Sequence, residues 1–455
     1  MPTRATPSTV AAQLVRVARL GQKALLAAVL SLTACRKDHP TPALTSVEPS
    51  DFLHVPVPSE DGPKLASVAN LTPIVETPGS PTPSRLGYLH AGARVARSTR
   101  PIDAPGCKGG WYAVRPRGFV CLDQGATLDL AHPTLKAMAL SPKLEETLPY
   151  TYAKTNMATD LYSVDRGRPK RVKSTSKLPR HSRFAVVGSW VAKNEHDAEL
   201  RLAMLPNGSF VDAATLSPVK APDFSGVELG EQASLPLAFV VKRGVHTWAL
   251  NEGEKPQTTD PLGYHQRVEL TGKYRTVSGS QYWGTKDNAF VRHQDVTLIR
   301  RRNTFPDFAT DNEKWIDVSV TMGTLVLYEG KKPIFATLVS VGRDRLDEEG
   351  SASTTRGTFE IVAKHITHVE LDPTRAAEGY EVYDVPWALE LSSGQMIHAA
   401  FWHDRFGIEF GPGNLQLSPA DAHRLWAWAD PELPSGWYAA YAGVGQKRVR
   451  VVIRT

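Results

Sequence analysis

A helix with well-marked ends follows a glycine-rich turn near the end of this 455-residue chain. The turn, residues 411–414, reads Gly-Pro-Gly-Asn. Ser418 then suits a helix N-cap and Pro419 the first helical position, while Asp430-Pro431 ends the helix. The positive N-terminal end of such a helix favours an anion or a thiolate in the turn before it.

The residues around this turn follow a recognisable order, with His398, then Trp402-His403 and Phe406-Gly407, then Leu-Ser-Pro-Ala-Asp-Ala at 417–422. This order resembles the active-site segment of the L,D-transpeptidase (YkuD-type) family. That family carries a His-Gly pair, a Trp-His-x-x-Phe-Gly stretch in many bacterial members, Ser-His-Gly-Cys, and Val-Asn-Leu-Ser-Pro-x-Asp-Ala. The resemblance covers about residues 312–455, and the segment aligns without a gap.

The resemblance implies acyl transfer in peptidoglycan, by a Cys thiolate that attacks a carbonyl of a peptide stem. Such a reaction needs a nucleophile, a base and donors for the oxyanion. His398 would be the base, and the backbone at Gly413 and Asn414 would stabilise the oxyanion. The implied substrate groove is bordered by Trp387, Trp402, His403 and Phe406.

The nucleophile of the family is missing from this chain. The family Cys falls on Asn414, the His before it on Pro412 and the Ser on Gly411, while Gln416 replaces an Asn. A carboxamide has no accessible anion near neutral pH, and loss of a covalent nucleophile costs many powers of ten in rate. We therefore expect a pseudoenzyme: a peptidoglycan-associated protein with the transpeptidase fold that does not cross-link.

Two other functions stay open at this point. The chain could be a residual or rerouted transpeptidase with Ser418 as nucleophile, although a helix cap would occupy that hydroxyl. It could also be a structural envelope anchor with a vestigial domain. For His398 and His403, the alternative to a catalytic role is packing and hydrogen bonding within a sheet.

The C-terminal third also has the pattern of strands. Residues 314–320 alternate as a half-buried strand, 324–328 and 332–341 continue the pattern, and Glu329-Gly330 makes a hairpin turn. A last strand is expected at 448–453. The predicted fold class is mainly β: an L,D-transpeptidase-like β-sandwich with one or two short helices at 312–455, preceded by small SH3-like β-barrel modules.

The N-terminus resembles a bacterial lipoprotein signal. Four cations precede an apolar run at 24–32, which ends in Leu-Thr-Ala-Cys at Cys35. The run is too short to span a membrane. We predict a signal peptide at 1–35 with lipidation at Cys35, which would anchor the protein to a membrane on the periplasmic side of the cell envelope. An ordinary secretory signal or an uncleaved anchor remains possible.

Residues 36–84 are rich in proline, serine and threonine and are expected to be a disordered tether. Removing the four cations before Cys35 from the net charge of +6 leaves about +2. This mild charge gives no support for nucleic-acid binding. The basic runs 166–173 and 300–302 are read as solvated loops, with attraction to an anionic wall as the alternative.

Two small regions of β pattern precede the C-terminal domain. At 85–131, the strands around Cys107 and Cys121 resemble a bacterial SH3-like domain, and the two cysteines should form a disulfide in an oxidising compartment. Residues 150–310 are expected to hold one or two further β modules. These modules either bind wall components or act as spacers. No cofactor or metal site is predicted. The expected partners are peptidoglycan, a membrane through the lipid anchor, and a cell-wall enzyme as a further candidate.

Overall fold

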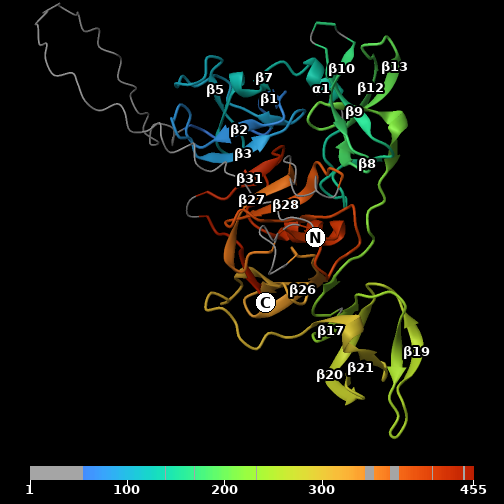
Figure 1. Cartoon of the computed structure of the whole chain (residues 1–455). Helices are drawn as coiled ribbons and strands as arrows, with labels where there is room; N and C mark the ends of the chain where they lie inside the picture. The colour runs from blue at the N-terminus through green and yellow to red at the C-terminus, as the bar shows by residue number, and fades with distance from the viewer. Residues whose placement is uncertain are drawn as a thin grey trace, which may run out of the picture. The chain divides into compact units, whose positions relative to one another are not determined.

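The computed structural model describes residues 55–138, 140–165, 167–168, 170–231, 233–343, 353–368, 379–411, 413–443 and 446–455. Strands dominate these residues, which confirms the mainly β fold class (Figure 1). The expected signal peptide and its Cys35 lie outside the described residues. In the described part of the chain, no helix has the length and apolar character needed to cross a membrane.

The N-terminal module contains the three-stranded sheet β4-β1-β7 and the strands β3-β2-β6-β5, which form one end of a larger sheet; neither closes into a barrel. The closed barrel expected for residues 85–131 is therefore wrong, and the SH3-like resemblance stays a prediction. Buried residues such as Leu65, Ile74 and Leu89 form its core. The strands are β1 (Lys64–Ser67), β2 (Thr72–Val75), β3 (Arg85–Leu89), β4 (Arg94–Ala96), β5 (Trp111–Ala113), β6 (Phe119–Cys121) and β7 (Ala126–Thr127).

Two of these strands, β1 and β2, lie within the segment expected to be a tether. Leu65 and Ile74 are fully buried, so the tether expectation is wrong from residue 64 onward. Each strand has only four residues, and β2 contains Pro73. Strands this short give too weak a local pattern to be recognised, and their order depends on β4 and β3 further along the chain.

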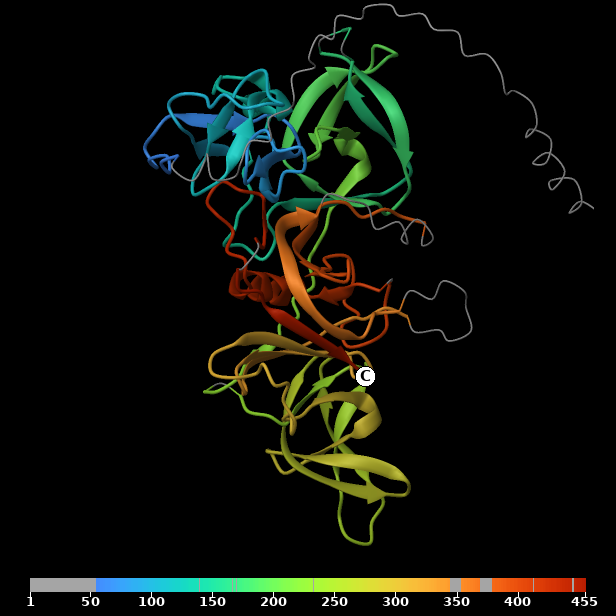
Figure 2. The ribbon, with the colours of Figure 1, turned by 90° about the vertical axis from the view of Figure 1, so that its left-hand side faces the viewer.

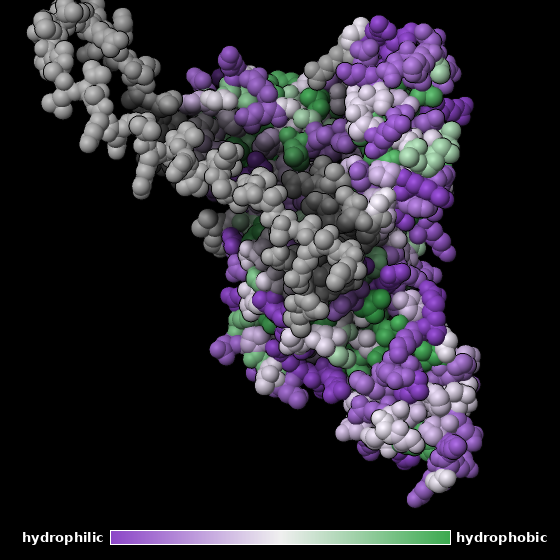
Figure 3. Space-filling model, viewed as in Figure 1, coloured by the Kyte–Doolittle hydropathy of each residue, from purple (hydrophilic) through white to green (hydrophobic). Residues whose placement is uncertain are grey.

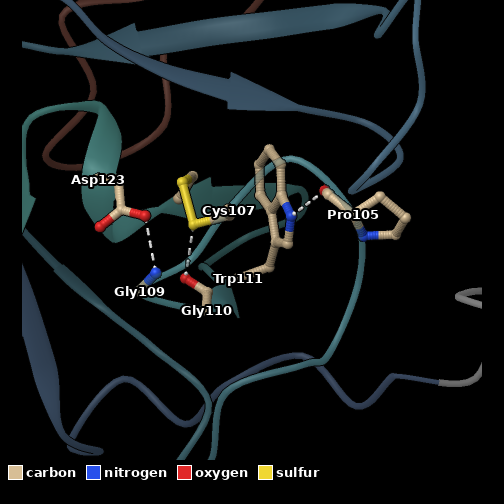
Figure 4. Close-up of a disulfide and its surroundings, with 7 residues drawn as sticks. Pro105, Cys107, Gly109, Gly110, Trp111 and Asp123 are labelled. Carbon is tan, nitrogen blue, oxygen red and sulfur yellow. Dashed lines mark hydrogen bonds between the residues drawn. A yellow bond between two sulfur atoms is a disulfide. The ribbon is translucent and has the colours of Figure 1, made fainter.

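Cys107 and Cys121 form a disulfide across a sequence separation of 14 residues. Hydrogen bonds also fix the residues around this disulfide (Figure 4). The indole N–H of Trp111 donates to the Pro105 carbonyl at 3.0 Å, and the Gly109 N–H donates to Asp123 at 2.7 Å. The sulfur atoms lie near the Asp123 carboxylate, but a disulfide offers no thiolate to a metal ion.

The second module occupies residues 133–218 and forms two sheets, with orders β10-β9-β14-β13-β12 and β11-β8-β15. Figure 2 shows the strong curvature of the first sheet, in green. Its elements are α1 (Pro133–Ala137), β8 (Thr151–Thr155), β9 (Thr159–Val164), β10 (Val172–Leu178), β11 (Arg183–Val186), β12 (Gly188–Lys193), β13 (Glu199–Met204), β14 (Phe210–Asp212) and β15 (Leu216–Pro218).

The third module is a sheet with order β19-β18-β22-β21-β20-β17-β23. It has its own core, which includes Val240, Leu270, Trp283 and Val291. Its strands are β17 (Leu237–Val240), β18 (Val245–Ala249), β19 (Gln257–Leu262), β20 (Arg267–Val277), β21 (Ser280–Thr285), β22 (Phe290–Arg292) and β23 (Val296–Ile299).

The C-terminal domain has the strands that the sequence predicts at its start and end. Strand β24 pairs with β25 and, in parallel, with β32. Its elements are β24 (Lys314–Ser319), β25 (Thr324–Glu329), β26 (Lys332–Leu338), β27 (Gly357–His368), β28 (Val385–Leu391), β29 (Met396–Ala399), β30 (Leu415–Leu417), α2 (Pro419–Trp428), β31 (Ala439–Tyr441) and β32 (Arg450–Arg454).

The long strand β27 joins the two halves of this domain. Its first residues pair with β32, and its later residues pair with β28 and β31. Residues from both halves, such as Val318, Leu327, Leu389 and Leu417, share one hydrophobic cluster. Burial of this continuous apolar surface is the main stabilising term for the domain.

Strands from other modules extend the sheets of the C-terminal domain. β3 pairs with β31, and the short strand β16 (Val227–Glu228) pairs with β26. Gly87 in β3 is required by this close approach, since a Cβ there would lie 2.2 Å from the Ala439 carbonyl oxygen. Hydrophilic residues cover most of the described surface in the view of Figure 3.

Candidate functional site

Two short parallel strands carry the residues on either side of the glycine-rich turn. β29 and β30 pair so that His398 lies beside Gln416 and Ala399 beside Leu417. The backbone of Gln416 also exchanges two hydrogen bonds with Ser340, at 2.8 and 2.9 Å. His398, Gln416 and Ser340 are all buried. The end of the turn is thus held between two neighbouring strand segments.

Asn414, at the expected position of the nucleophile, has a structural role in this turn. Its Oδ1 accepts a hydrogen bond from the Met396 N–H at 3.0 Å. The preceding carbonyl, of Gly413, accepts one from the Gln395 side chain at 2.6 Å. Both bonds join the turn to the start of β29. Asn414 therefore stabilises the loop conformation, and its amide has no chemistry that could form an acyl intermediate.

His398 keeps a geometry that suits a base. Its Nδ1–H donates to the Ala399 carbonyl at 3.1 Å, so Nε2 is the ring nitrogen that can accept a proton whenever the ring is neutral. The ring is 3% exposed and lies 5.9 Å from the Trp402 ring, centroid to centroid. A base with this tautomer is the arrangement that activates a neighbouring nucleophile in acyl transfer.

Gln416 and Gly411 fit each other in this chain. A Cβ on Gly411 would lie 2.7 Å from Gln416 Nε2, and Gly411 has a φ of +85°, which other residues rarely adopt. The long Gln416 side chain thus takes the space that a side chain at residue 411 would need. A side chain at residue 411 is therefore incompatible with the present position of Gln416.

Gln416 also holds the His403 ring. His403 Nδ1 accepts from the Arg405 N–H at 3.1 Å, so its Nε2–H donates to Gln416 Oε1 at 2.6 Å. The Nε2 group of Gln416 is buried and makes no hydrogen bond to the residues that the structure describes. The sequence did not predict this link between residues 403 and 416, because the resemblance carries no partner for either side chain.

Ser418 is occupied as a helix cap, as the sequence suggests. Its Oγ accepts a hydrogen bond from the Asp421 N–H at 3.2 Å, and the residue is fully buried. Helix α2 begins at Pro419 and ends at Trp428, close to the predicted bounds. A capping hydroxyl without solvent access is a poor nucleophile, so Ser418 does not replace the missing thiol.

The expected groove residues do not lie on one surface. Trp387 is 1% exposed, and its indole N–H donates to the Thr147 carbonyl at 2.7 Å. Phe406 is fully buried in a cluster with Phe224. The groove assignment is wrong for these two aromatic residues, because segments outside the domain cover them. Trp402 and His403 do line an open cleft.

Two buried carboxyl groups of the C-terminal domain have raised pKa values. Burial raises the pKa of Asp384 to about 7, although the Ala185 N–H favours the ionised form. Burial also raises the pKa of Asp421 to about 6, against hydrogen bonds from Thr337 and Gly226. Both groups hold their proton more tightly in the folded protein than in the unfolded chain, where the value is 3.8.

We expect the substitution Asp384→Asn to flatten the pH dependence of stability. Because the folded-state pKa is raised, the stabilising contribution is fully present below about pH 3.8 and is lost as the pH rises towards about 7. The slope for one group is at most about 1.4 kcal/mol per pH unit. Urea unfolding of the unmodified protein and the variant across this pH range gives the difference in their free energies of unfolding. The contributions of other titrating groups cancel in this difference. Parallel curves would contradict the expectation.

The comparisons with known proteins concern the C-terminal domain. Residues 313–453 match the model of the L,D-transpeptidase catalytic domain. An L,D-transpeptidase from Stackebrandtia nassauensis is 19% identical, over 33% of this chain and 60% of that chain, with a TM-score of 0.23. One from Mycobacterium smegmatis is 18% identical, over 40% and 77%, with a TM-score of 0.25. Scores this low support no inference about function. A search of curated proteins found no match.

Proposed function

Because residues 313–453 form a domain of the L,D-transpeptidase (YkuD) family, whose members cross-link peptidoglycan, we propose that this protein binds peptidoglycan without cross-linking it. The observation that carries the proposal is Asn414. It stands where the family has its nucleophile, and its Oδ1 is bonded to the Met396 N–H. The chain spans 60% of the length of the first solved relative, so its own substrate is part of the proposal.

The other groups that could act as a nucleophile are already engaged elsewhere, which supports the absence of catalysis. The hydroxyl of Ser418 caps helix α2, and the cysteines at 107 and 121 are joined in a disulfide of another module. The amide of Asn414 cannot be activated as a nucleophile by a histidine base. We include the lipid anchor at Cys35 in this proposal, because an anchored protein of the periplasmic side would meet the cell wall.

The test is incubation of the full-length protein with disaccharide-tetrapeptides from a muramidase digest. Mass spectrometry should find neither released D-Ala nor 3–3 cross-links. In sedimentation with isolated sacculi, the protein should be retained. Clear turnover by the unmodified protein would refute catalytic silence, and absence from the sacculus pellet would refute peptidoglycan binding.

A pair of variants tests whether only the nucleophile is missing or whether the surrounding site is also unable to support the reaction. Asn414→Cys with Pro412→His restores the thiol and its neighbour, and leaves the fit between Gln416 and Gly411 intact. We expect D-Ala release above background from this protein, since His398 retains the required tautomer. The matched control is Asn414→Ala with Pro412→His, which should stay inactive. Equal inactivity of both, despite alkylation of the introduced thiol by iodoacetamide, would show that the site itself is lost.

A further inference from the structure

An open cleft of about 900 Å³ lies beside the Trp402–His403 pair. Most of its lining comes from outside the residues matched by the family model. Lys154 and Arg183 come from the second module, residues 218–225 from the linker after it, and Arg243 and Tyr264 from the third module. The volume is typical of a site for a small ligand or a short peptide.

The linker wall of this cleft is fixed to the C-terminal domain. The Gly226 N–H donates to Asp421 at 2.8 Å, and Glu228 accepts two bonds from Arg424, at 2.6 and 3.2 Å. Phe224 packs against Phe406, with 5.7 Å between ring centroids. These contacts hold the wall in one position before any ligand binds.

The walls from the second and third modules are fixed in the same way. The backbone of Arg183 donates to the Glu381 carbonyl at 2.8 Å and accepts from Tyr383 at 2.9 Å. The hydroxyl of Tyr264 donates to the Asp404 carbonyl at 3.2 Å. A cleft held at three sides is preformed, which lowers the entropic cost of binding.

The cleft carries an excess of positive charge. Arg243 is neutralised by Asp404 at 2.8 Å. Among the residues that the structure describes, no carboxylate forms an ion pair with Lys154, Arg183 or Lys220, and Asp223 is the other acid in the lining. An excess of about two positive charges in a concave surface attracts ligands with more than one carboxylate.

Aromatic rings lie among these cations. Tyr264 is covered by the Arg243 guanidinium, 4.4 Å from the ring centroid, and the half-buried Trp402 also lines the cleft. Burial lowers the pKa of His265 to about 4, so this ring is neutral at physiological pH and adds apolar surface. Rings beside cations suit a ligand that has both carboxylates and flat or aliphatic parts.

We propose that this cleft binds a peptide or glycopeptide that carries at least two free carboxylates, and that it is the surface through which the protein holds peptidoglycan stems. The inference rests on the proposed function for the source of the ligand. It assigns recognition to the added modules and the linker, and not to the turn around Asn414.

Isothermal titration calorimetry of the full-length protein with a disaccharide-tetrapeptide tests this inference. The double variant Lys154→Gln/Lys220→Gln should raise Kd by about tenfold, because each exposed ion pair contributes up to about 1 kcal/mol. Methyl esterification of the probe should weaken binding at least as much, and high salt should weaken it as well. The matched control is Lys173→Gln/Lys177→Gln, which changes the net charge equally on the exposed strand β10.

The outcomes separate the cleft from the wider proposal. An unchanged Kd for the cleft variant, or equal binding of the esterified probe, would overturn the cleft assignment even if the protein still sediments with sacculi. Conversely, carboxylate-dependent binding of the probe by a protein that is not retained on sacculi would support a carboxylate-binding cleft and would overturn its assignment as the surface that holds the intact cell wall. A similar loss in the control variant would mean general charge attraction and would overturn the specific site.

Discussion

Replacing Trp387 with alanine is expected to lower the free energy of unfolding by about 3–5 kcal/mol, the usual cost of deleting a large buried aromatic side chain. The indole is 1% exposed and packs on Trp426 at 4.8 Å between ring centroids. Its N–H donates to the Thr147 carbonyl, which the substitution would leave without that donor. Urea unfolding followed by circular dichroism measures the change.

The variant Trp387→Phe provides the control. It keeps most of the buried volume and loses the N–H, so a cost of about 1–2 kcal/mol is expected. The two variants also distinguish a buried structural role for Trp387 from a role in a substrate groove. If Trp387 bordered a substrate groove, as the sequence suggests, alanine would leave stability almost unchanged and would weaken retention on sacculi. That result would contradict the structural role.

A loss of similar size is expected for Asp421→Ala. The buried Asp421 carboxylate accepts hydrogen bonds from the half-buried Gly226 N–H and from the buried Thr337 hydroxyl. Each buried donor left without an acceptor costs about 1–3 kcal/mol, so the total should be about 3–5 kcal/mol. Because Gly226 belongs to the linker, the variant should also free β16 from β26. Hydrogen exchange of the Val227 amide would report this release.

A double-mutant cycle with Thr337 tests the mechanism. Thr337→Val removes one of the two donors, so the double variant should lose less stability than the sum of the single variants. Asp421→Asn should cost less than alanine, since its Oδ1 can still accept from Gly226. Strict additivity of Asp421→Ala and Thr337→Val would mean that the side chains do not interact. A loss below about 1 kcal/mol for Asp421→Ala would contradict the burial cost itself.

Local patterns predicted the parts of the fold that depend on neighbouring residues. Helix α2 could be placed because Ser418 and Pro419 mark its start. Strand β24 could be placed because its apolar residues alternate, and β25 and β26 because two apolar runs flank the Glu329-Gly330 turn. Strands β1 and β2 were missed, because four residues give little periodicity and their burial requires β3 and β4. The expectation of closed barrels was also wrong, since sheet closure depends on pairing between distant strands.

The candidate site also has features that the sequence predicted and features that only the tertiary structure revealed. Residue identity alone showed that position 414 has no thiol, and cap chemistry alone showed that the Ser418 hydroxyl is occupied. The burial of Trp387, the fit of Gln416 against Gly411 and the charged cleft beside Trp402 appear only in the tertiary structure. Trp387 meets its partner Thr147 across 240 residues of sequence. Contacts over such separations arise from the packing of whole modules, whereas a helix cap or a missing nucleophile depends on a few adjacent residues.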